Sequence, residues 1–171
     1  MFRIKNVNLL SKIEMKQFYD LLTNSNMNKE IDNSIIWELL YLRKIISKKS
    51  MKSTIHSDTH KRYDYLIFED GEAIGYFCIR KPTFRFTSKK NNEYEIILYI
   101  LETHMNENII QYLGNELNEF KEDYFDADDI LKLSVLSDKT QLISLLNKNS
   151  VFKLVKIDKQ TFNIPLNIYQ V

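Results

Sequence analysis

The chain has 171 residues, a length that suits one domain with a substantial core. Its net charge is +1 and 44% of its residues are hydrophobic, so nothing favours bulk binding to nucleic acid or to a membrane. Cys78 is the only cysteine, which excludes an internal disulfide and predicts a reducing, cytoplasmic setting. We therefore expect a single domain over residues 1–171, with no metal and no nucleic-acid partner.

The N-terminal part of the chain predicts one strand and two helices. Residues 2–7 alternate weakly between apolar and polar, as in a strand. Residues 9–24 have the apolar spacing of one helix face, and Ser11 is a candidate cap for that helix. A second helix is expected from about 32 to 48, where apolar residues cover a broad face.

A β-hairpin is the clearest local signal in the sequence. The strands expected at 63–69 and 73–80 flank Asp70 and Gly71, a pair that favours the positive φ angles of a tight hairpin turn. Gly75 stands inside the return strand, which indicates a bulge or the close approach of another backbone.

The centre of the chain predicts a buried strand, a short polar turn and a helix. Residues 93–101 are too densely apolar for a half-exposed strand. Residues 108–124 carry apolar side chains at the spacing of one helix face. The first N–H groups of a helix are unpaired, so the turn at 102–107 is a candidate anion site.

The C-terminal part predicts a strand, a helix and two further strands. The strands are expected at 130–136, 151–157 and 162–171, and Asp138 or Thr140 is the expected cap of the intervening helix. The order is therefore strand, two helices, three strands, helix, strand, helix, two strands. An α+β fold follows, with about seven strands and about four helices.

These patterns resemble the GNAT superfamily of acetyl-CoA-dependent N-acetyltransferases. The hairpin with a glycine in its return strand is matched by residues 69–76, and the family's fourth strand by 95–100. The family's phosphate-binding loop corresponds to 105–110. A later family pattern falls on Val135, Lys139, Leu142, Leu146, Ser150 and Val151. The resemblance implies a mixed, mostly antiparallel central sheet.

The resemblance also implies an acetyl-CoA site and no metal. Backbone groups of Tyr99, Ile100 and Leu101 would hold the pantetheine arm like a missing sheet partner. The N–H groups of residues 105–110 would face the pyrophosphate, and Lys139 would be the nearby cation. The residues expected around the cofactor are thus Tyr99, Ile100, Leu101, His104, Met105, Asn106, Glu107, Asn108, Ile109, Ile110 and Lys139.

Glu95 falls where some members of the family carry a general base. There it would take the proton from the attacking amine, through water, and an apolar wall that raises its pKa would suit this role. The alternative is an ordinary surface glutamate that faces solvent or pairs with a lysine.

The chain departs from the family at several functional positions. Met105 replaces an arginine or glutamine of the loop, and Asn108 and Ile110 replace its glycines, so a branched side chain stands where phosphate normally approaches. Glu107 adds a negative charge at the anion site. Leu146 replaces the tyrosine that usually protonates the departing thiolate.

Two functions from different classes remain open. The first is transfer of acetyl from acetyl-CoA to a primary amine of a small molecule, peptide or protein. The second is a non-catalytic module of the same fold that binds a protein or senses an acyl-CoA. A longer acyl chain is a third alternative, because Met105 and Ile110 make the site more apolar.

Other features leave the partners open. The acceptor groove is expected at 25–52 and 159–162, and a homodimer through 162–171 is an alternative to a monomer. His56 and His60 have a spacing that could bind a metal only on a helix. An acidic run is expected to be a solvated face or to attract a cationic amine. It comprises Glu116, Glu119, Glu122, Asp123, Asp126, Asp128 and Asp129.

Overall fold

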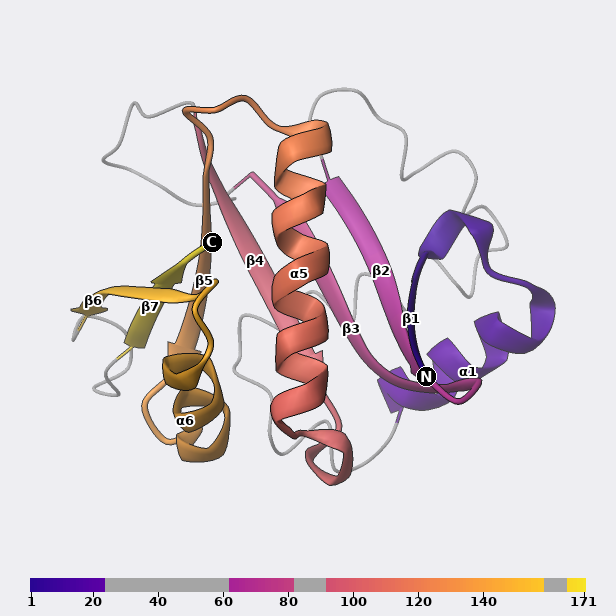
Figure 1. The fold of residues 1–171 in the computed structure, drawn as a ribbon. Helices are drawn as coiled ribbons and strands as arrows, with labels where there is room; N and C mark the ends of the chain where they lie inside the picture. Colours follow the sequence, from indigo (N-terminus) through magenta and orange to yellow (C-terminus); the bar gives the residue numbers. More distant parts are fainter. Residues whose placement is uncertain (24–61, 82–91, 159–165) are drawn as a thin grey trace. The chain divides into compact units, whose positions relative to one another are not determined.

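The computed structural model describes residues 1–23, 62–81, 92–158 and 166–171. Within these residues, seven strands form one sheet in the order β1-β2-β3-β4-β5-β7-β6 (Figure 1). They are β1 (Phe2–Asn6), β2 (Arg62–Glu69), β3 (Glu72–Arg80), β4 (Glu93–Ile100), β5 (Ile130–Leu136), β6 (Lys153–Asp158) and β7 (Leu166–Gln170). The helices are α1 (Lys12–Thr23), α5 (Glu107–Tyr124) and α6 (Thr140–Lys148), with short 3-10 turns η1 (Val7–Leu9) and η2 (Glu102–His104).

The sheet is mixed, and the predicted fold class is confirmed. β4 and β5 run parallel, whereas β1–β2, β5–β7 and β6–β7 are antiparallel pairs. The helix expected at about 32–48 lies outside the described residues. The cap expected for α6 is wrong, because Lys139 occupies the cap position without a side-chain hydrogen bond, and Thr140 is already helical.

The described residues group into two compact units. Unit 1 comprises Met1–Cys78 and Leu98–Leu101, and unit 2 comprises Ile79–Ile97 and Glu102–Val171. The single domain expected over the whole chain stays a prediction.

Unit 1 contains the predicted hairpin. Asp70 and Gly71 have φ angles of +49° and +91°, as the sequence indicates for this turn. Gly75 confirms the close backbone approach, since a Cβ atom there would lie 2.5 Å from the Tyr99 carbonyl oxygen. Cys78 is fully buried, as expected for a small apolar residue.

The start of α1 is a capping box, in which the cap and the third helical residue bond each other's backbone. The Glu14 N–H donates to Ser11 Oγ at 3.3 Å, and the Ser11 N–H donates to the Glu14 carboxylate at 2.7 Å. Arg3 and Lys5 of β1 also donate to that carboxylate. The Lys5 and Ser11 hydrogen bonds lower the pKa of Glu14 from 4.5 to about 2. Glu14 therefore links α1 to β1.

We expect Glu14→Gln to lower the free energy of unfolding by about 1–2 kcal/mol at neutral pH. Solvent screens the attraction between the Glu14 carboxylate and Lys5, so the loss of stability is smaller than the pKa shift alone implies. Because the folded pKa is lowered, the contribution is present above pH 4.5 and is lost as the pH falls towards about 2. Denaturant titrations at both ends of this range measure it, with Glu72→Gln, an exposed glutamate of β3, as the control. An equal deficit at both pH values would contradict the assignment.

The core of unit 2 lies between α5 and the strands. Ile109, Ile110, Leu113 and Leu117 are buried along one face of α5, at the predicted helical spacing. The other face of α5 is polar. The helix is therefore held by one apolar stripe and leaves its remaining surface to solvent.

Gly114 lets the middle of α5 approach the segment that leads into β6. A Cβ atom at Gly114 would lie 3.2 Å from Asn149 Oδ1 and 3.3 Å from Val151 Cβ. The Val151 N–H in turn donates to Asn149 Oδ1 at 2.9 Å. The turn between α6 and β6 is thus fixed against the middle of α5.

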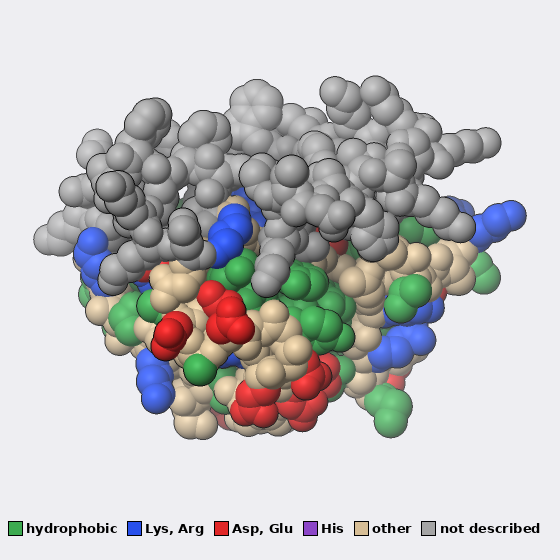
Figure 2. All heavy atoms as spheres, turned by 90° about the horizontal axis from the view of Figure 1, so that it is seen from above, with side chains coloured by type: hydrophobic (Ala, Val, Ile, Leu, Met, Phe, Trp, Pro, Cys, Tyr) green, Lys and Arg blue, Asp and Glu red, His purple; other side chains and the backbone are tan. Residues whose placement is uncertain are grey.

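Most of the acidic run is exposed to solvent, whereas Glu116 is half-buried and Asp129 is buried. Asp129 is buried, and its carboxylate accepts a hydrogen bond from the Asp126 N–H at 3.0 Å, so it closes the turn before β5. The carboxylates of Glu119, Glu122 and Asp123 are exposed. Figure 2 shows Asp and Glu side chains gathered on the face seen from above.

β7 is paired on both edges, with β5 and with β6. Residues 166–170 therefore offer no open strand edge to a second copy, and the homodimer stays a prediction. None of the helices in the described ranges is long and apolar enough to cross a membrane.

Candidate functional site

The pairing of β4 with β5 stops halfway along β4. The register runs from Glu93 opposite Ile130 to Ile96 opposite Leu133, and β4 continues for four more residues, to Ile100. Parallel neighbours otherwise exchange evenly spaced hydrogen bonds along their whole length. The predicted pantetheine-binding residues thus follow the point where the ladder ends.

Of these residues, Leu101 is already engaged within unit 1. Its N–H donates to the Ile74 carbonyl at 2.9 Å. The side chains of Tyr99 and Ile100 are buried, and the Tyr99 carbonyl lies against Gly75. The backbone of Ile100 is therefore the better candidate for a cofactor contact than that of Leu101.

In unit 2, Asn106 caps the start of α5. Its Oδ1 accepts from the Ile109 N–H at 3.1 Å, and its Nδ2 donates to the His104 carbonyl at 3.2 Å. Its extended backbone, with φ −146° and ψ 175°, is usual for such a cap. The cap fixes the direction in which the first N–H groups of α5 point.

Three of the six amides predicted to face a pyrophosphate are used inside the chain. The Met105 N–H donates to the Glu102 carbonyl, the Ile109 N–H to the cap and the Ile110 N–H to the Asn106 carbonyl. Within the described residues, no acceptor is found for the N–H groups of residues 106–108. If this helix start binds an anion, these three amides are the donors that remain for it.

Two side chains of α6 contact this helix start. Gln141 Nε2 donates to the Met105 carbonyl at 3.0 Å, and Lys148 Nζ lies 2.6 Å from the Glu107 carboxylate. The hydrogen bond from Lys148 lowers the pKa of Glu107 below its ordinary value. Glu107 therefore stays charged, and Lys148 offsets the negative charge that the sequence places at the anion site.

Ile110 does not stand over the helix start, contrary to the expectation from the sequence. Its side chain is only 1% exposed, because it belongs to the apolar face of α5. This also removes Ile110 as a reason to expect a longer acyl chain. Leu146, at the position of the family's tyrosine, is fully buried and forms part of the core.

The two other residues predicted to contact the cofactor lie at the ends of short elements. Lys139 is the cap residue of α6, two positions before Gln141, and its side chain is half-buried. His104 ends η2 and is also half-buried. The described residues contain no group of three His, Cys, Asp or Glu side chains that could hold a metal. His56 and His60 lie outside those residues.

Glu95 is part of an ion pair on unit 2. Its Oε2 accepts from both Nε and a terminal nitrogen of Arg80, each at 3.2 Å, and its side chain is 34% exposed. The partner of Glu95 is thus an arginine, not the lysine that the sequence offered as one alternative. The role of Glu95 as a base stays a prediction.

Sequence reasoning missed Arg80, Gln141 and Lys148. Each lies on another element than its partner, 15 to 41 residues away in the chain. A local pattern cannot report such pairs. The weak signal that was present is the unmatched charge of Glu107, which calls for a cation on a neighbouring element.

The fold is that of the GNAT N-acetyltransferases, and acetyltransferases are among the solved structures that it resembles. RimL, a ribosomal L7/L12 alpha-N-protein acetyltransferase in complex with coenzyme A, has a TM-score of 0.65 at 15% identity, over 99% of this chain and 93% of its own. An acetyltransferase of the GNAT family from Streptococcus pneumoniae has a TM-score of 0.63 at 13% identity, over 100% and 98%. Campylobacter jejuni N-acetyltransferase PseH, in complex with acetyl coenzyme A, has a TM-score of 0.55 at 16% identity, over 100% and 98%.

These likenesses establish the fold. No protein-family profile matches the sequence, and no curated protein matches it. Neither an activity nor an acceptor follows from the fold alone.

Proposed function

We propose that this protein is an N-acetyltransferase that transfers the acetyl group of acetyl-CoA to a primary amine of a small molecule, peptide or protein. The observation that supports it best is the β4–β5 ladder that ends after Ile96, followed along the chain by a capped helix start with unused amides. RimL and PseH, which share the fold, were solved with CoA and acetyl-CoA. A cytoplasmic setting belongs to the same proposal.

The cofactor contacts in this proposal rest on backbone groups. The amides of residues 106–108 bind the pyrophosphate, helped by the positive end of the α5 dipole. Lys139 supplies a cation, while Lys148 is occupied by Glu107. Backbone donors do not depend on side-chain identity, so the replacement of the loop glycines does not by itself remove the site.

The transfer proceeds by direct attack within a ternary complex. The amine nitrogen bonds to the thioester carbonyl carbon, the carbon–sulfur bond breaks, and CoA leaves as the thiolate. Glu95 accepts the proton released by the nitrogen, through water. Leu146 has no proton to give, so the thiolate is protonated by solvent. Acetyl-CoA supplies the activated acyl group, and the chain supplies binding and the base.

The use of the α5 amides is tested by two variants at one position. Glu107→Pro removes the first helical N–H, and proline is tolerated there because Asn106 before it is already extended. Glu107→Ala loses the same carboxylate but keeps the N–H. We expect the alanine variant to bind acetyl-CoA at least as tightly as the parent and the proline variant to bind about tenfold or more weakly. Isothermal titration calorimetry measures both, and equal affinities would contradict the assignment.

Thermal unfolding separates the enzyme from its alternatives. A ligand at a hundred times its dissociation constant adds about 2.7 kcal/mol of stability. If millimolar acetyl-CoA did not raise the Tm, the proposal would be rejected. Stabilisation without transfer to any amine in a panel of small amines and N-terminal peptides would favour the acyl-CoA-sensing module instead.

A further inference from the structure

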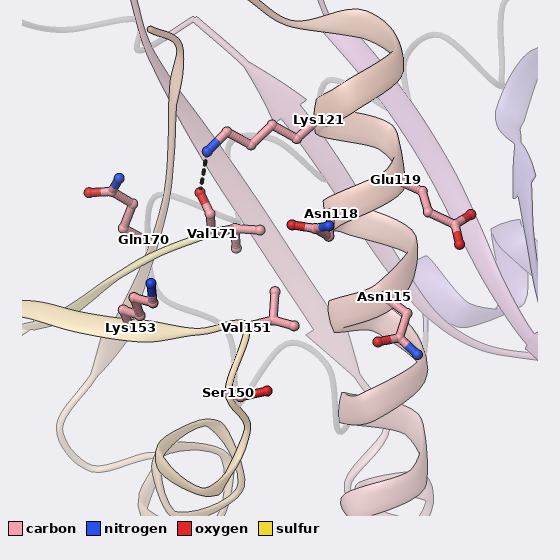
Figure 3. A pocket seen from close by; sticks show the side chains of 9 residues that line it. All are labelled: Asn115, Asn118, Glu119, Lys121, Ser150, Val151, Lys153, Gln170 and Val171. Atoms are coloured by element: carbon pink, nitrogen blue, oxygen red, sulfur yellow. Dashed lines mark hydrogen bonds between the residues drawn. The ribbon is translucent and has the colours of Figure 1, made fainter. Parts of the chain in front are cut away.

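β6 is the last strand of the sheet, and one of its edges has no partner strand among the residues that the structure describes (Figure 1). Its other edge pairs with β7 in antiparallel register. The first pair is Lys153 and Gln170, which Figure 3 labels where β6 begins and β7 ends. An unpaired strand edge presents N–H and C=O groups that can pair with another strand. A further strand could therefore be added at β6.

Apolar side chains are exposed along this edge strand. Leu154, Val155 and Ile157 are 46%, 51% and 55% exposed. They are three of the eight large hydrophobic side chains that are exposed among the described residues. Single exposed apolar side chains are ordinary, but three within four residues of one strand form a patch that indicates an interaction surface. Another chain that covered β6 would remove this patch from water, which is favourable.

A β-bulge brings two of these side chains to one face of the sheet. The register with β7 skips Val155, which is therefore the extra residue of the bulge. Leu154 lies opposite Tyr169, and Ile157 lies opposite Asn167, two residues earlier in β7. Strand residues two apart share a face, and so do residues directly opposite each other. Leu154 and Ile157 therefore lie on the same face, although they are three residues apart in the chain.

The sequence of β6 is complementary to itself in antiparallel orientation. If a two-fold axis passes through the middle of the strand, Leu154 lies opposite Ile157 of the second copy, and Ile157 lies opposite Leu154 of that copy. Both apolar pairs then meet on one face. Lys153 of each copy lies opposite Asp158, a residue of opposite charge. This register thus pairs apolar residues with apolar ones and a basic residue with an acidic one.

Lysines and bulges often protect an edge strand from such pairing, because like charges meet or the strand bends away. In this register no two lysines meet, since Lys156 lies opposite Val155 of the second copy. A shift by one residue would place Lys156 opposite itself, and the reverse shift would place Leu154 opposite Lys156. The apolar residues and the charges of β6 therefore favour one register over its neighbours.

We propose that β6 is the contact surface of a symmetric homodimer, in which it pairs antiparallel with β6 of a second copy of this chain. A second copy is the occupant that matches the edge, because the strand complements itself in both hydrophobicity and charge. The pairing covers Leu154 and Ile157 of both copies. It requires neither acetyl-CoA nor an acceptor, so it is independent of the proposed function.

Sedimentation velocity of the full chain tests whether this dimer forms. We expect a monomer–dimer equilibrium at concentrations between about 1 μM and 1 mM. Ile157→Lys should weaken the dimer about tenfold or more, because both copies lose an apolar contact and place an ammonium group opposite Leu154. Ile13→Lys is the matched control, since it makes the same change at an exposed isoleucine of α1, and it should dimerise like the parent. A parent that stays monomeric, or a dimer that Ile157→Lys leaves unchanged, would overturn the proposal.

Disulfide cross-linking tests the register. Cα atoms of opposite residues in an antiparallel pair lie about 4.5–5.5 Å apart, within the span of a disulfide. Leu154→Cys mixed with Ile157→Cys should therefore give covalent dimers on oxidation, whereas each variant alone should not; the only native cysteine, Cys78, is fully buried. Leu154→Cys mixed with Lys156→Cys is the control, because Lys156 lies on the other face. Equal cross-linking in the two mixtures, or none in the first, would overturn the proposal.

Discussion

Gly75→Ala is expected to lower the free energy of unfolding by about 3 kcal/mol or more, which corresponds to a fall in Tm of about 6–12 °C for a chain of this size. The added Cβ would lie 2.5 Å from the Tyr99 carbonyl oxygen, a separation that real Cβ atoms do not adopt. The atom that must move is backbone, so a change of side-chain rotamer cannot relieve the contact. The same Cβ would lie 3.3 Å from the Cα of Ile100, a second backbone atom that limits how it could be accommodated.

The matched control is Gly71→Ala in the same hairpin. There a Cβ meets nothing within 4 Å, but φ is +91°, so alanine experiences backbone strain of about 1–2 kcal/mol without a steric contact. Thermal and denaturant unfolding compare the two variants. If Gly75→Ala were no more destabilised than Gly71→Ala, the close approach of β3 to the end of β4 would be wrong.

The same pair of variants also reports on function. The end of β4 carries the backbone groups proposed to hold the pantetheine arm, and the Gly75 variant must displace them. We therefore expect Gly75→Ala to lose acetyl-CoA affinity, whereas Gly71→Ala, at the hairpin turn, keeps it.

The hairpin was predictable from the sequence because its determinants are local. Asp70 and Gly71 are adjacent, and the φ angles that they favour are a property of each residue's own backbone. Gly75 was predictable as a close approach for the same reason, since only its missing side chain had to be noticed. What the sequence could not provide was the neighbour: nothing near Gly75 in the chain identifies Tyr99.

The start of α5 was predictable in its position, but its contacts were not. Asn106 before an apolar helical pattern marks a cap, so the helix start lies where expected. The burial of Ile110 depends on how α5 is rotated about its axis, and the reading of its side chain as an obstacle ignored the helical face to which it belongs. The cap of α6 was assigned to the wrong residue because polar candidates stand on both sides of Lys139.

The surroundings of the Glu95 side chain could not be predicted from the sequence, because they depend on tertiary structure. The alternation of the strand gives the face on which its side chain lies, but Arg80 comes from β3. Two hydrogen bonds from a guanidinium hold the carboxylate in one orientation. This orientation suits a positioned base and equally suits a structural ion pair, so kinetics must distinguish the two.

We expect Glu95→Gln to lower turnover of an accepted amine by about 10²- to 10⁴-fold, the usual contribution of a general base, with acetyl-CoA affinity unchanged. Glutamine keeps an oxygen that can accept from Arg80, so the strand pairing is retained. Arg80→Gln is the matched control: it breaks the same ion pair but leaves the carboxylate. If Glu95 is the base, the pH dependence of kcat/KM on the acidic side disappears in Glu95→Gln and persists in Arg80→Gln. Equal losses of turnover in the two variants, or unchanged turnover in Glu95→Gln, would leave the ion pair as a structural feature and require the base to be sought elsewhere.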